Sequence, residues 1–142
     1  MYTKSIFVAS LAFVLAACGH VDPNRVTRPA GSKPFQGDRA ELVQLGATLW
    51  KDTSLSTNGI ACQGCHVNGA QFKKSFAAAY PHPVAMAKSM ANLKAIDAEQ
   101  MVQFCMIVPM KAEPLPWDSK KLAALTAYIE DSEQPSFKSK KM

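Results

Sequence analysis

The strongest constraint in the chain is the pentapeptide Cys62-Gln63-Gly64-Cys65-His66. Two cysteines three positions apart lie on one helical turn, and the histidine that follows projects from the same side. This spacing is typical of covalent haem attachment, in which both sulfurs bond to one porphyrin edge and the imidazole reaches the iron. We therefore predict one haem c, bound covalently through Cys62 and Cys65, with His66 as the proximal axial ligand.

Other uses of a Cys-x-x-Cys pair suit this sequence less well. A structural zinc site needs a second pair of ligands, and only the scattered His82 and Cys105 are available. A thioredoxin-like redox pair belongs to a fold with strands around it, and the sequence shows no convincing run of alternating strands. A plain disulfide between Cys62 and Cys65 would leave His66 without a role. Haem attachment is therefore the favoured interpretation.

The first residues have the pattern of an export signal. Lys4 is followed by an almost wholly apolar run from Ile6 to Ala17, which is shorter than the about 20 residues that a transmembrane helix needs. The run ends in Leu15-Ala16-Ala17-Cys18-Gly19, which resembles a bacterial lipobox. We predict a lipoprotein signal peptide over residues 1–17 and lipidation of Cys18. This places the protein on the periplasmic face of a bacterial membrane, or free in the periplasm if Cys18 is not lipidated.

The rest of the chain divides into three segments by composition. Residues 18–37 contain three prolines, Pro23, Pro29 and Pro34, and no apolar period, which predicts a flexible linker. Residues 38–131 carry the Cys-x-x-Cys-His motif and the helical patterning, so they are the expected folded domain. Residues 132–142 are polar and basic, which predicts a frayed tail.

The central segment is predicted to be all-α. Asp38 with Glu41, and Asp97 with Gln100, have the spacing of helix-capping pairs. Apolar residues at helical spacing predict helices over about 39–51, 84–95 and 98–107, and a last helix that starts at Asp118 or Ser119 and runs to about residue 130. Three prolines between the last two helices forbid a continuous helix there.

Residues 38–131 resemble the class I cytochrome c family. The resemblance is carried by the leading helix with Gly46 and Leu49-Trp50, the attachment motif, Pro109-Met110, and the final Leu125-Thr126-Ala127-Tyr128-Ile129. It implies a cytochrome c-like fold of helices around one haem, with the first and last helices crossing where a small residue such as Gly46 permits contact. The stretch from Leu49 to Gly59, together with the five-residue spacing of Cys105 and Met110, is also similar to haem domains of thiosulfate-oxidising cytochromes.

The resemblance also suggests the distal ligand of the iron. In this family it is usually a methionine from a loop before the final helix, and Met110 occupies that place. Cys105 is the alternative, because the similar sulfur-oxidising domains can use a cysteine at the matching position. A neutral thioether raises the redox potential, whereas an anionic thiolate lowers it.

Further polar roles around the haem follow from the same family. The N–H of the proximal imidazole is expected to bind a carbonyl of a proline after the motif, here Pro81 or Pro83. Trp117 and Tyr80 are candidate donors to a haem propionate. His82 is expected to be an ordinary surface histidine.

These features predict electron transfer, as a carrier or as the carrier subunit of an oxidoreductase. The alternative is the haem subunit of an enzyme that oxidises thiosulfate or related sulfur compounds. The formal net charge is +5, but no dense basic cluster interleaved with aromatics is present, so nucleic acid is not an expected partner. Redox partner proteins are expected, and if their surfaces are acidic, Lys73, Lys74 and Lys111 near the haem would steer docking.

Overall fold

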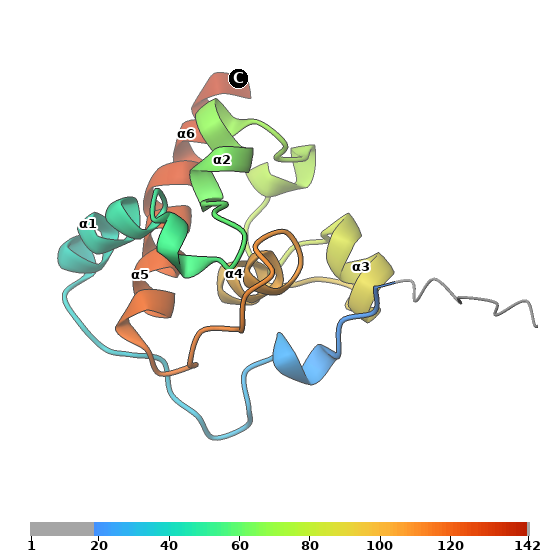
Figure 1. Cartoon of the computed structure of the whole chain (residues 1–142). Helices are drawn as coiled ribbons and strands as arrows, with labels where there is room; N and C mark the ends of the chain where they lie inside the picture. Colours follow the sequence, from blue (N-terminus) through green and yellow to red (C-terminus); the bar gives the residue numbers. More distant parts are fainter. Residues whose placement is uncertain (1–18, 142) are drawn as a thin grey trace, which may run out of the picture.

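The computed structural model describes residues 19–141, so the predicted signal peptide and Cys18 lie outside it. The described part is helical and contains no named strand, only one isolated antiparallel bridge between His82 and Ile96. The all-α prediction is therefore confirmed. The helices in Figure 1 are α1 (Arg39–Leu49), α2 (Cys62–His66), α3 (Ala85–Ala91), α4 (Ala98–Ile107), α5 (Lys120–Tyr128) and α6 (Gln134–Lys141).

Local capping explains where the longer helices begin. Asp38 accepts a hydrogen bond from the Glu41 amide at the start of α1, and Asp97 forms a reciprocal capping box with Gln100 at the start of α4. Ser119 caps α5 in the same way. The four predicted helices are confirmed, with α3 shorter than expected because Asn92 adopts a left-handed conformation (φ 55°) that ends it.

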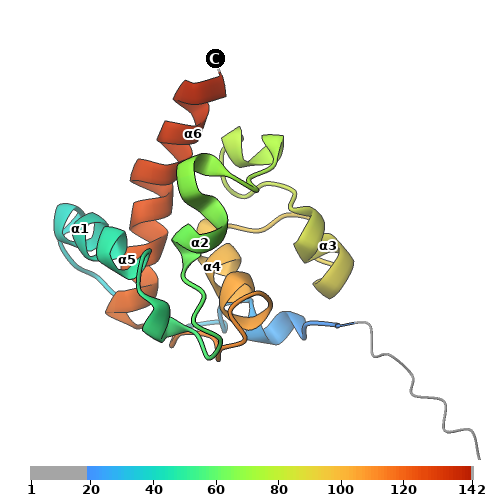
Figure 2. The same ribbon diagram turned by 45° about the horizontal axis from the view of Figure 1, so that its top comes forward.

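Helices α1 and α5 cross in close contact, and Figure 2 shows them side by side. Gly46 lies at the crossing. A Cβ atom built there would collide with the backbone carbonyl of Ala124 and lie 2.5 Å from the Cβ of Tyr128. The expectation that Gly46 permits this contact is confirmed. Around the crossing, buried side chains from α1, α4 and α5 form the main core, which includes Leu42, Leu49, Val102, Met106, Leu122 and Leu125.

The structure differs from the flexible linker expected over residues 18–37. Val21 and Val26 are buried in a second apolar cluster with residues of α3 and α4, and the Val21 amide donates to the carbonyl of Met90 at 2.9 Å. Arg28 pairs with Glu99 and stacks over the ring of Trp117 at 5.2 Å. Val21 and Val26 form no periodic apolar pattern, so the prolines of this segment lead to the prediction of a flexible linker. The segment is ordered because both valines are buried against residues far away in the sequence.

The end of the chain is also more ordered than its composition predicts. A single π-type turn, Ile129–Glu133, links α5 to α6, and the two helices form one column in Figures 1 and 2. Phe137 of α6 is buried between Phe72 and Phe76, and the Gln134 side chain donates to the carbonyls of Phe76 and Ala78, each at 2.9 Å. One buried aromatic anchors an otherwise polar segment.

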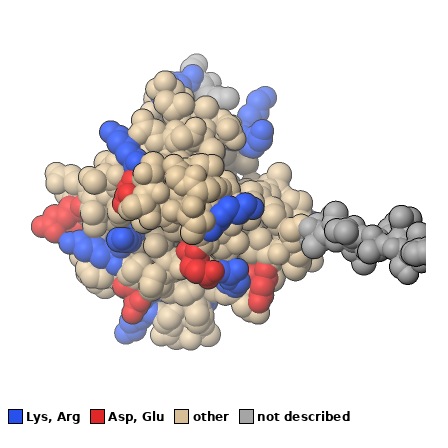
Figure 3. All heavy atoms as spheres, viewed as in Figure 1, with Lys and Arg blue, Asp and Glu red and all other residues tan. Residues whose placement is uncertain are grey.

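The described surface carries charges of both signs. On the face shown in Figure 3, Lys and Arg side chains are interspersed with Asp and Glu side chains. Between residues 19 and 141, no helix combines the length and apolar character required to cross a bilayer.

The Gly46 contact gives a direct test of the fold. We expect Gly46→Ala to lower the free energy of unfolding of the haem-loaded protein by about 1–3 kcal/mol, because the added methyl group forces α1 and α5 apart. Helix propensity alone would predict the opposite change, because alanine stabilises a helix more than glycine does. Denaturant unfolding measures it, with Gln44→Ala on the exposed face of α1 as the control. An unchanged midpoint in Gly46→Ala would contradict the close crossing.

Candidate functional site

A cavity opens between α2, the segment that follows it, and helices α4 and α5. Its empty volume is about 1070 Å³ including the open mouth. The wall is mainly apolar and aromatic, as in pockets that bind large organic cofactors. Cys62, Cys65 and His66 line the cavity, together with both distal-ligand candidates, Cys105 and Met110. The structure therefore brings together all five residues that the sequence predicts to hold a haem.

The attachment motif forms helix α2, and a backbone hydrogen bond links this helix to the residue that follows α1. The amide of Gln63 donates to the carbonyl of Trp50 at 3.0 Å. No disulfide joins the two motif cysteines, so both sulfurs are available to bond to a porphyrin. Burial raises the pKa of the Cys62 thiol to about 11.

His66 is held in an orientation suited to binding iron. Its Nδ1 lies 3.1 Å from the carbonyl oxygen of Ala70, and its ring stacks on Phe72 with centroids 4.1 Å apart. Burial is the main cause that lowers the pKa of the imidazole and favours its neutral form. If Nδ1–H donates to Ala70, Nε2 is left free to bind a metal.

The acceptor carbonyl is not the one expected from the family. Ala70 takes the place predicted for Pro81 or Pro83. The reason is local, because Asn68 and Gly69 adopt positive φ values of 54° and 80° and turn the chain back towards α2. This turn directs the Ala70 carbonyl at the imidazole.

Aromatic side chains form a row along one wall of the cavity. Phe72 stacks on Phe76 at 3.8 Å, and Phe76 meets His82 edge-on at 6.5 Å. Trp50 and Tyr80 also line the cavity, whereas Trp117 does not and instead lies beneath Arg28. The expectation that His82 is a surface residue is wrong, since only 3% of it is exposed.

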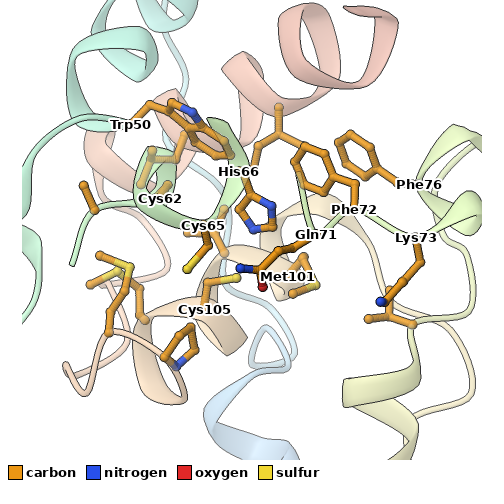
Figure 4. A pocket seen from close by; sticks show the side chains of 18 of the residues that line it. Trp50, Cys62, Cys65, His66, Gln71, Phe72, Lys73, Phe76, Met101 and Cys105 are labelled. Atoms are coloured by element: carbon orange, nitrogen blue, oxygen red, sulfur yellow. The ribbon is translucent and has the colours of Figure 1, made fainter. Parts of the chain in front are cut away.

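The two candidates for the distal ligand differ in how they meet the cavity. Figure 4 shows the Cys105 thiol of α4 pointing into the same space as the His66 imidazole. Met110 lies in the loop after α4, packs in the main core, and is only 2% exposed. Hydrogen bonds from Thr57 to the Met110 carbonyl (3.3 Å) and from Asn58 to the Pro109 carbonyl (2.8 Å) fix that loop.

Burial keeps the Cys105 thiol protonated in the absence of a metal. Its pKa is raised to about 12, mainly by desolvation. A nearby cationic iron would reverse this preference, because metal-bound thiols ionise.

Gln71 and Met101 also line the cavity, although the sequence did not identify either of them as a site residue. Met101 lies on a helical face and has the pattern of an ordinary core residue, and Gln71 belongs to no motif.

The residues present fit a covalently bound haem. Two thiols and a neutral imidazole lie in one wall of an aromatic cavity, and a further thiol lies in the wall formed by α4. Within the described residues, no group of three or more His, Cys, Asp or Glu side chains is placed to hold a metal ion by itself.

Comparison with known proteins points in the same direction. A family model described as SoxA/TsdA, cytochrome c domain, matches residues 45–134. The L-cysteine S-thiosulfotransferase subunit SoxA of Pseudaminobacter salicylatoxidans is 32% identical over 103 residues, which are 72% of this chain and 34% of that protein. The chain thus spans about a third of the length of this relative. No solved structure matches the chain.

Proposed function

Because the chain belongs to the SoxA/TsdA cytochrome c domain family, we propose that it is the electron-transferring haem unit of a system that oxidises thiosulfate or a related sulfur compound. A cytochrome c domain carries covalently bound haem c and works by haem-based electron transfer. The sulfur substrate is the new part of the proposal. It is supported by the name of the SoxA relative, an L-cysteine S-thiosulfotransferase subunit, and by the cavity-facing Cys105 thiol.

We propose a single haem, because the sequence contains one Cys-x-x-Cys-His motif. Cys62 and Cys65 would hold the ring covalently, and His66 would bind the iron through the nitrogen that Ala70 leaves free. The haem supplies one-electron redox chemistry at its iron. The mainly apolar and aromatic wall would surround the haem, and this burial would tune its reduction potential together with the axial ligands.

For the distal ligand, the structure supports Cys105 more strongly than Met110. An iron ligand must present its sulfur to the cavity. Both residues line the cavity, but Figure 4 shows the Cys105 thiol pointing into it, whereas only 2% of Met110 is exposed. The resemblance to sulfur-oxidising domains, which can place a cysteine here, favours the same residue. A thiolate ligand would stabilise ferric iron and lower the potential.

We also propose that the protein is exported to the periplasm and anchored through lipidated Cys18. The docked segment that begins at Val21 supports a short tether, since it is already packed on the domain. The domain would then lie close to the membrane. Lys73 and Lys74 are exposed beside the cavity segment, and we retain them, with Lys111, as candidate contacts for an acidic redox partner.

Haem attachment is expected to require both motif cysteines. Acid–acetone extraction should leave haem on the wild-type protein, and Cys62→Ala or Cys65→Ala should each leave at most one thioether and little stable holoprotein. Mass spectrometry of the purified chain measures the bound group, and Cys105→Ser serves as the control because it retains both thioether positions. Clean extraction of haem from the wild type would refute covalent attachment.

The two distal-ligand candidates predict opposite results in a matched pair of variants. With thiolate ligation by Cys105, Cys105→Ser should raise the midpoint potential and abolish the thiolate features of the ferric spectrum, while Met110→Ala should leave both nearly unchanged. Optical redox titration measures both properties. A far-red iron–thioether band that disappears in Met110→Ala would instead establish methionine ligation.

The proposed sulfur substrate is tested in a bacterium that encodes this protein. Deletion of the gene should abolish thiosulfate-dependent oxygen uptake while leaving succinate-dependent uptake intact, and the wild-type gene should restore the activity. A general electron carrier would affect both substrates. Unchanged thiosulfate oxidation in the deletion strain would overturn the proposal.

A further inference from the structure

The N-terminal segment of the described chain packs against helix α3. A Cβ atom built at Gly19 would lie 3.6 Å from the methyl carbon of Met90, and the Val21 amide donates to the Met90 carbonyl at 2.9 Å. Val21 is also buried in one cluster with Ala87 and Ala91 of α3. Figures 1 and 2 both show the start of the described chain, in blue, beside this helix. The chain therefore leaves the folded domain at α3.

This contact limits the distance between α3 and a lipid attached to Cys18. Cys18 directly precedes Gly19 in the sequence, and the Cα atoms of consecutive residues are about 3.8 Å apart. Acyl chains on Cys18 would thus begin one residue away from the contact between Gly19 and Met90. Because no long linker separates the anchor from the domain, α3 would lie at the bilayer surface.

The exposed side of α3 carries the charge that suits an anionic membrane. Lys88 on α3 and Lys94 just after it are exposed, as are the small residues Ala85 and Ser89. We call these four residues the α3 surface. The Lys88 ammonium group donates to the neutral side chain of Asn92 at 2.7 Å, and this contact leaves its positive charge uncompensated. Lysines held beside a membrane are attracted to anionic headgroups, and small neighbouring side chains let the headgroups approach.

The sequence contains few carboxylates around this surface. No Asp or Glu occurs between Asp52 and Asp97, whereas the same stretch contains four lysines, Lys73, Lys74, Lys88 and Lys94. Asp97 and Asp22 adjoin the α3 surface along the chain, and both act as helix caps by accepting from backbone amides. An anionic bilayer would therefore meet a net attraction on this side of the domain.

We propose that the α3 surface binds anionic phospholipid headgroups of the membrane in which Cys18 is anchored. This inference rests on the proposed export and lipidation. The short connection to Cys18 favours lipid over an acidic protein at this surface, since a protein would have to enter between α3 and the bilayer. Val84 and Ala85, at the start of α3, also line the cavity. The contact would therefore hold this side of the haem site close to the membrane.

Lysine footprinting of the lipidated holoprotein tests the contact. The protein is acetylated with an amine-reactive ester in detergent micelles, on phosphatidylcholine vesicles, and on phosphatidylcholine vesicles that contain phosphatidylglycerol. Mass spectrometry locates the modified lysines. Lys88 and Lys94 should react about threefold more slowly on the phosphatidylglycerol vesicles than under the other two conditions. This protection should weaken as ionic strength rises, because salt screens exposed charges.

Two other lysines provide an internal control. Lys120 and Lys121 are exposed at the start of α5, and Figures 1 and 2 both show this end of α5 well apart from α3. Their acetylation rates should be the same in micelles and on both kinds of vesicle.

A pair of double variants tests the role of charge. Backbone amides of α3 should exchange hydrogen more slowly on phosphatidylglycerol vesicles than in micelles, as measured by mass spectrometry. Lys88→Gln combined with Lys94→Gln should remove this slowing, because the headgroups lose their cationic partners. Lys120→Gln combined with Lys121→Gln should retain it. All four lysines are exposed, so folding does not depend on their charges.

Failure of this inference can be distinguished from failure of the proposed function. If Lys88 and Lys94 react equally fast in micelles and on phosphatidylglycerol vesicles, in a protein whose mass shows a lipid on Cys18, the α3 surface does not bind headgroups and remains open to a protein partner. Equal protection on phosphatidylcholine vesicles would also overturn the contact with anionic lipid. A mature protein without a lipid on Cys18 would instead refute the proposed anchoring, and this inference with it.

Discussion

The close crossing of α1 and α5 at Gly46 is the contact on which the site depends. It packs α1 against α5, and the carbonyl of Trp50, the residue after α1, accepts from the Gln63 amide in the first turn of α2. The Trp50 ring also lies 5.8 Å from the His66 ring. The same helix therefore positions the attachment motif through its backbone and the proximal histidine through a side chain. The packing at Gly46 is thus connected, through Trp50, to two residues that line the cavity or adjoin it, His66 and Gln63.

Much of the fold was predictable because it is encoded locally. Asp38, Asp97 and Ser119 act on amides two or three positions away, so capping patterns identified the helix starts without knowledge of tertiary structure. Val21, Val26 and Phe137 are different, since each is an isolated apolar residue in a polar segment and has no period to reveal it. Their burial depends on partners in distant parts of the chain, which composition alone does not supply. This explains why the segments on both sides of the domain were expected to be looser than they are.

The same distinction applies to the site. The motif specifies three of its residues by spacing alone, and the structure brings them to one wall. The acceptor for His66 depends instead on two positive φ values at Asn68 and Gly69, which no motif signals. Sequence spacing nominates both Met110 and Cys105 as distal ligand. Which of their sulfurs is exposed to the cavity depends on how several elements assemble, so spacing alone could not predict it. The burial of His82 depends on the same assembly.

The electrostatic character of the cavity follows from this assembly. Its wall is aromatic and apolar, so charge within it is costly unless a partner lies close by. If Cys105 is the distal ligand, its thiolate would compensate the positive charge of ferric haem at the iron. Phe72 and Phe76 stack in a row between His66 and His82, so the aromatic wall continues beside the proximal ligand. A wall of this kind would favour a charged ligand only where that ligand meets an opposite charge, and the iron is the place where the cavity would provide one.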